Sequence, residues 1–62
     1  MSRMVPDPQV RARYGGISAT TLWRWDQDPD LGFPKPIVIR RRKFRDESEL
    51  DAFDARQRAR SA

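Results

Sequence analysis

The sequence predicts a mainly α-helical fold with one small β-hairpin, a winged helix-turn-helix of three helices and a two-stranded wing. Two short helical segments are separated by a tight turn that begins at Gly15-Gly16. The β-branched run Ile37-Val38-Ile39 then indicates a strand, and a cluster of basic residues follows it. A third helical segment begins at Asp46, so the pattern is helix, turn, helix, hairpin, helix.

The first helix is expected over residues 7–14, after a flexible arm at residues 1–6. Asp7 is suited to cap free backbone N–H groups, and Pro8 at the first helical position sacrifices no hydrogen bond. Gly15-Gly16 ends the helix, because glycine adopts positive φ without steric cost.

The second helix is expected over residues 19–27, with Ser18 as its N-cap. At 100° per residue, Leu22 and Trp25 lie on one side of this helix. The opposite side is polar, and it carries Thr20, Arg24 and Gln27.

The hairpin is expected to pair residues 37–39 with residues 43–45. Its turn is placed only near residues 40–42, because the segment has neither Gly nor Asn and a two-residue type I′ turn would be strained. The third helix is expected over residues 47–58, with Asp46 and Glu49 as a capping box. The folded domain is therefore predicted over residues 7–58, with a short tail at 59–62.

Composition excludes several classes of protein. The chain has 62 residues, no Cys and no His, which removes disulfides, zinc fingers, thiol nucleophiles and imidazole bases. So short a chain has no room for a deep substrate cavity, and we expect no enzyme, no metal and no cofactor. The longest apolar run has three residues, far below the roughly 18 that cross a bilayer, so a cytoplasmic protein is expected.

Charge is distributed in two blocks. Residues 40–45 hold five basic groups, residues 46–54 hold five acidic groups, and the net charge is +4. A dense basic block suits phosphate backbones, although a solvated surface is the plain alternative. The acidic block is better explained by helix capping and a solvated face than by a metal site, and it should point away from a polyanion.

These observations favour double-stranded DNA as the partner. A helix with small hydroxyl residues can approach a duplex closely, and an arginine one turn later can reach a guanine or a phosphate. An amphipathic helix facing water is the alternative, and Trp23 is equally compatible with a core-rim position and with a phosphate contact. The candidate residues are Ser18, Thr20, Thr21, Trp23, Arg24 and Gln27 on the recognition helix, and Arg40, Arg41, Arg42 and Lys43 in the wing.

Three segments carry a family resemblance: Arg13 to Trp25, Gly32-Phe33-Pro34-Lys35-Pro36-Ile37, and Arg45 to Leu50. Together they resemble the AlpA-like and phage excisionase group of small winged-helix proteins, related in fold to the DNA-binding domain of MerR-type regulators. The resemblance implies that Ser18, Thr20, Thr21, Trp23 and Arg24 face DNA, with Arg41, Arg42 and Lys43 in the wing. Family members often have Gly where this chain has Arg40-Arg41.

The resemblance implies a bacterial, nucleoid-associated protein of a phage or mobile element. The expected function is that of an excisionase, a recombination directionality factor that bends DNA beside an integrase. An AlpA-like transcriptional regulator is the runner-up, since both would use the same contacts. Two further classes stay open, a protein-interaction module with an acidic partner and an RNA-binding protein. With one reading helix per monomer, several copies on repeated DNA sites are expected.

Overall fold

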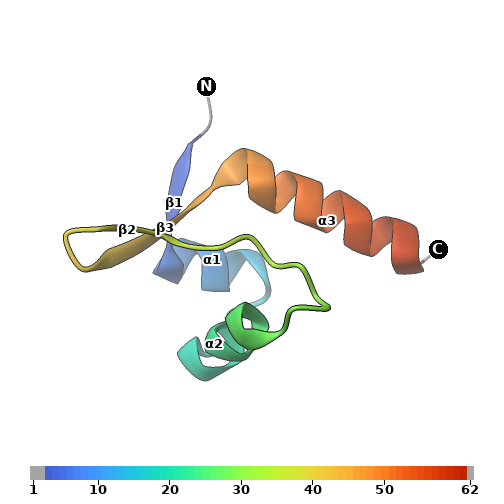
Figure 1. Cartoon of the computed structure of the whole chain (residues 1–62), viewed down its shortest axis with the longest axis horizontal. Helices are drawn as coiled ribbons and strands as arrows, with labels where there is room; N and C mark the ends of the chain where they lie inside the picture. Colours follow the sequence, from blue (N-terminus) through green and yellow to red (C-terminus); the bar gives the residue numbers. More distant parts are fainter. Residues whose placement is uncertain (1–2, 62) are drawn as a thin grey trace.

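The computed structural model describes residues 3–61, which form three helices and a small three-stranded antiparallel sheet (Figure 1). The strand order is β1-β3-β2, so β3 lies at the centre of the sheet. In chain order the elements are β1 Met4–Pro6, α1 Asp7–Arg13, α2 Ala19–Gln27, β2 Ile37–Ile39, β3 Arg42–Asp46 and α3 Glu47–Ser61. The three predicted helices and the hairpin are present, and one strand is additional.

The additional strand, β1, lies in the segment predicted as a flexible arm. It pairs antiparallel with β3 and places Val5, which is buried, opposite Arg45. The arm prediction is therefore wrong for residues 4–6; residues 1–2 lie outside the described residues. Three residues are too few to show a strand periodicity, and the pairing partner lies near the other end of the chain.

Helix α1 begins one residue earlier than its predicted cap implies. Pro6 occupies the N-cap position without a side-chain cap bond, and Asp7 is the first helical residue. Its carboxylate there still complements the helix dipole. The helix ends as predicted: Gly15 and Gly16 have φ of 81° and 78°, and the Gly16 amide donates to the Arg11 carbonyl at 2.9 Å.

Helix α2 has the predicted bounds. The Ser18 hydroxyl accepts a hydrogen bond from the Thr21 amide at 3.1 Å, which is the N-cap contact that the sequence predicts. Helix α3 also begins as predicted but runs to Ser61, so the predicted tail is helical up to that residue. At its start, the Asp46 carboxylate accepts from the Ser48 amide at 3.0 Å.

The hairpin turn has the two-residue form. Ile39 pairs with Arg42, which leaves only Arg40 and Arg41 between the strands. Their φ values are 47° and 67°, and two consecutive positive values are the requirement of a type I′ turn. This turn matches the twist of the strands, but it forces two arginines into a backbone region that favours Asn and Gly.

The core gathers one or two apolar side chains from most elements. Phe33 and Phe53 meet edge to face with ring centroids 4.9 Å apart, and Tyr14 and Trp25 pack around them in the same manner. The buried apolar residues are Val5, Val10, Leu22, Phe33, Leu50 and Phe53. The side of α2 predicted to carry Leu22 and Trp25 does face the core, with Leu22 buried and Trp25 partly buried against it.

One cation is part of this core. The Arg45 side chain is 0% exposed and donates to the Asp26 carboxylate at 2.8 Å. Its guanidinium carbon lies 4.8 Å from the centre of the Phe33 ring. The basic block of residues 40–45 is therefore exposed only at residues 40–43, and Arg45 instead joins β3 to α2.

Candidate nucleic-acid interface

The outward face of α2 carries the polar residues that the sequence places there. Thr20, Arg24 and Gln27 lie within about 60° of one another around the helix axis and are all exposed. Trp23 lies at the edge of this face and is 57% exposed. A large aromatic side chain that remains this open to water is available for a partner.

Ser18 and Thr21 are committed mainly to the start of the helix. The Ser18 hydroxyl donates to the Thr21 hydroxyl at 3.0 Å while it accepts from the Thr21 amide. Thr21 is half-buried. These two hydroxyls fix the end of α2, whereas Thr20 and Arg24 project from it.

The tip of the hairpin is a group of four exposed cations, Arg40, Arg41, Arg42 and Lys43. Within residues 3–61 no carboxylate forms an ion pair with any of them. Positive φ costs a residue other than glycine about 1–2 kcal/mol, and this turn contains two such residues. The tip of the hairpin therefore combines four exposed cations with a turn whose two central residues are both in a strained backbone region.

Helix α2 and the hairpin border the same hollows. One of about 340 Å³ is lined by Trp23, Gln27 and Lys43, together with Lys35 and Pro36 of the preceding loop and Asp26. A second, of about 220 Å³, again has Trp23 and Lys43 in its lining. The edge of the polar helix face and the cationic strand therefore lie beside each other. Helix α3 extends in the direction opposite to the hairpin (Figure 1).

Two residues of this surface are absent from the sequence prediction. Lys35 is exposed, forms no ion pair among the described residues, and lies between Gln27 and the hairpin. Asp26 would repel phosphate, but its carboxylate is bound by Arg45. The flanking Pro34 and Pro36 are a signal for Lys35, because they fix an extended chain that projects the lysine. No local signal identifies the partner of Asp26.

Two of the acidic residues of α3, Asp51 and Asp54, face α1. Arg13 donates to Asp51 at 2.7 Å and also to Asp54, and the Tyr14 hydroxyl donates to Asp54 at 2.7 Å. These carboxylate bonds raise the pKa of Arg13. Burial, followed by the bond to Asp54, raises the pKa of Tyr14. For Asp54, burial acts upward, but the bonds from Tyr14 and Arg13 outweigh it and lower the pKa.

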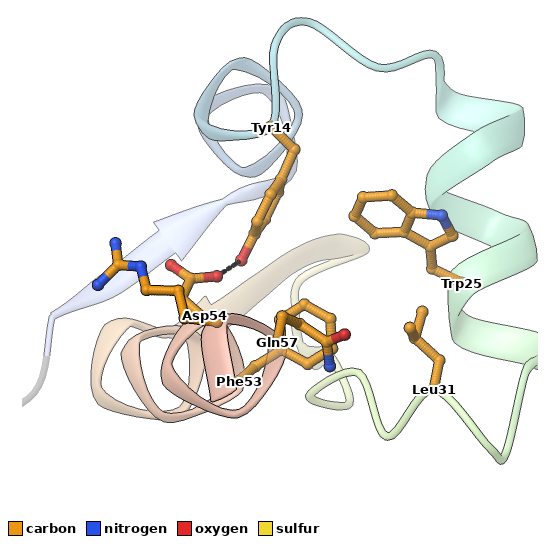
Figure 2. A pocket seen from close by; sticks show the side chains of 7 residues that line it. Tyr14, Trp25, Leu31, Phe53, Asp54 and Gln57 are labelled. Carbon is orange, nitrogen blue, oxygen red and sulfur yellow. Dashed lines mark hydrogen bonds between the residues drawn. The ribbon is translucent and has the colours of Figure 1, made fainter. Parts of the chain in front are cut away.

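A third hollow, of about 360 Å³, lies beside this network. Figure 2 shows Tyr14 and Trp25 on one side of it and Phe53 on the other, with the Tyr14 hydroxyl directed at Asp54. Its one carboxylate is already bonded to Arg13 and Tyr14. This hollow belongs to the flank of α2 that carries Trp25, whereas the hairpin lies on the flank that carries Trp23 and Asp26.

Residues 3–61 hold no metal site and no membrane span. No group of three or more acidic side chains there is arranged to hold a metal ion. Within the same residues, no helix combines the length and apolar character needed to cross a bilayer.

Comparison with known proteins gives no match to a family model, a curated protein or a solved structure.

Proposed function

We propose that the chain is a sequence-specific, double-stranded DNA-binding protein of the winged helix-turn-helix class. Helix α2 enters the major groove, where Arg24 reads a guanine and Thr20 and Gln27 contact neighbouring groups. The β2–β3 hairpin is the wing and binds phosphates through the exposed cations of residues 40–43. The observation that carries this proposal is that Trp23 of α2 and Lys43 of the wing line the same hollows.

Charge and shape support the same assignment. The four cations at the wing tip, which form no ion pair within residues 3–61, imply a salt dependence with a slope of about −3 to −4 for log affinity against log salt, if each neutralises one phosphate. Lys35 adds to the positive potential beside the helix, and the Asp26 charge is compensated by Arg45. Two acidic residues of α3, Asp51 and Asp54, are paired with Arg13 of α1, where they do not oppose the approach of a duplex.

The proposed biological role is that of an excisionase, in which several copies bend DNA beside an integrase, and it rests on the sequence resemblance. An excision assay with the neighbouring integrase, run beside a promoter-reporter assay, tests it. Excision without a promoter effect is the expected result. A promoter effect without excision would instead assign the AlpA-like regulatory role.

The DNA-binding proposal is tested by fluorescence anisotropy on duplexes selected from a random pool. Arg24→Ala is expected to weaken specific binding by about 1–3 kcal/mol and to relax sequence preference. Arg41→Ala/Lys43→Ala is expected to weaken binding to all duplexes alike and to reduce the salt slope by about 2.

Arg58→Ala/Arg60→Ala is the matched control, because it removes the same charge from the last turn of α3. It should leave the selectivity unchanged and reduce affinity far less than the wing variant. Absence of binding to any duplex at low salt would overturn the proposal. Equal loss in the control and wing variants would show that only net charge matters.

A further inference from the structure

The hollow of about 360 Å³ lies between α2, the loop that follows it, and α3 (Figure 2). We call it the α2–α3 hollow. Its apolar lining residues are Tyr14, Trp25, Leu31 and Phe53. Tyr14, Trp25 and Leu31 are only partly buried, so their side chains also border water. A concave site with apolar walls and a few polar groups has the composition of a binding site.

Three further side chains of α3 line the α2–α3 hollow, and they differ in what they can offer a ligand. The carboxylate oxygens of Asp54 accept hydrogen bonds from Tyr14 and Arg13, so this anion already has its partners. Gln57 is a half-buried neutral amide. Arg58 is exposed and forms no ion pair within residues 3–61. The hollow therefore offers apolar walls, an amide, and a guanidinium without an ion pair.

The end of α3 that borders the α2–α3 hollow is cationic. After Asp54 the described part of this helix has no carboxylate, and its exposed cations are Arg56, Arg58 and Arg60. The carboxylates of the loop after α2, those of Asp28 and Asp30, are not in the lining of the hollow. A ligand with an apolar group and an anion would therefore place its anion at the α3 end.

We propose that the α2–α3 hollow binds a segment of a protein partner in which one aromatic side chain is flanked by Asp or Glu. The volume is near the lower end of the roughly 300–1,000 Å³ of ligand pockets, so it suits one side chain. The aromatic ring packs beside Trp25 and Phe53, and a flanking carboxylate pairs with Arg58. A buried aromatic anchor with a charged rim is a common arrangement in protein interfaces.

The position of the hollow has a consequence for DNA binding, which alone rests on the proposed function. The hollow lies on the flank of α2 that carries Trp25, whereas Lys43 of the wing lies beside the flank that carries Trp23. A duplex and the partner segment therefore occupy different surfaces. The chain can then hold a protein at the DNA site that α2 recognises.

Binding is tested without DNA by NMR of the full chain, with the end-blocked peptide Glu-Asp-Phe-Glu-Asp as the probe. The expected dissociation constant is about 0.1–1 mM, because one side chain and few charges contribute. The indole N–H signal of Trp25 should shift on titration, while that of Trp23 on the other flank stays unchanged. A peptide with Ala in place of Phe, or with Lys in place of all four acids, should bind at least about tenfold more weakly.

Variants of the chain test the location of the site. Gln57→Glu is close to isosteric and adds an anion to the lining, and Arg58→Glu reverses the charge there. Each should weaken binding of the acidic peptide by at least about tenfold. Arg60→Glu is the matched control, because it makes the same charge change on a residue that does not line the hollow, and it should cost no more than about threefold. Circular dichroism verifies that each variant is folded.

Several results would overturn the proposal. They are no shift of the Trp25 signal at about 5 mM peptide, equal binding of the Ala peptide, and equal losses in folded Arg58→Glu and Arg60→Glu. A Trp25 shift on raising the protein concentration alone would show that a second copy covers the hollow, and preference for the Lys peptide would show a cationic partner. Either outcome excludes the acidic segment. No DNA is present, so a chain that binds no duplex leaves this proposal standing.

Discussion

Replacing Asp26 by Asn removes the carboxylate that holds Arg45, a fully buried cation. The Arg45 side chain is 0% exposed, whereas that of Asp26 is 15% exposed. Nε and Nη1 of Arg45 have no hydrogen-bond partner among residues 3–61, so the ion pair carries most of the compensation. The contact with the Phe33 ring remains in the variant, but it contributes only about 0.5–2 kcal/mol.

The expected loss follows from these contacts. Leaving a buried charge without its partner costs about 3–5 kcal/mol. A domain of 62 residues has a free energy of unfolding of about 3–9 kcal/mol, so Asp26→Asn should bring it close to the unfolding threshold. Arg45→Met should cost less, about 1–3 kcal/mol, because methionine fills much of the space and Asp26 borders water.

The assay is urea unfolding followed by tryptophan fluorescence. Trp25 reports on the core, since its ring centroid lies 5.4 Å from those of Tyr14 and Phe33. The double variant Asp26→Asn/Arg45→Met is expected to be more stable than Asp26→Asn alone, because no charge is then buried. A loss below about 1 kcal/mol for Asp26→Asn, or a double variant no better than the single one, would refute this account of the pair.

Three other predictions concern local features. Asp54→Asn should lower stability by about 1–2 kcal/mol at neutral pH. Since the folded-state pKa of Asp54 is lowered, this stabilisation is present above its ordinary pKa and is lost as the pH falls through the folded value, so acid-unfolding curves of variant and wild type should converge. Arg40→Asn/Arg41→Gly should raise the free energy of unfolding by about 1–2 kcal/mol, which a higher melting temperature would report, while DNA binding weakens. Ser18→Ala should cost about 1 kcal/mol in urea unfolding, through loss of the α2 cap.

Much of the fold is predictable because its signals are local. The bounds of α2 follow from a capping serine and an amphipathic spacing, and the end of α1 follows from two glycines. The strand β2 follows from three β-branched residues. Each of these signals acts within one or two turns of the chain, where propensity and capping are informative.

The remaining features depend on contacts between distant segments. In β3, an apolar residue would be expected to be buried and its charged neighbour exposed, yet the structure buries Arg45 completely and leaves Phe44 only partly buried. The reason is Asp26, which lies on another helix and supplies the charge that allows Arg45 to be buried. Strand β1 likewise exists only because β3 offers it an edge. Neither arrangement has a signature within its own segment.

The candidate interface, too, is predictable from the sequence only where its signals are local. The exposure of Arg24 and of residues 40–43 follows from helix periodicity and from the run of basic residues. The proximity of Lys35 to that surface does not, because it depends on how the loop before β2 passes α2. The sequence also predicts that a type I′ turn in the hairpin would be strained, and in the structure Arg40 and Arg41 both have positive φ.

The central claim is that the outward face of α2 and the tip of the wing bind one duplex together. It is tested most directly by NMR, with backbone amide shifts of the folded protein followed as a selected duplex is added. The account predicts shifts that saturate together at Thr20, Arg24 and Gln27 and at residues 40–43, while the last turn of α3 stays unchanged. Shifts confined to one of the two elements, or centred on α3, would contradict it.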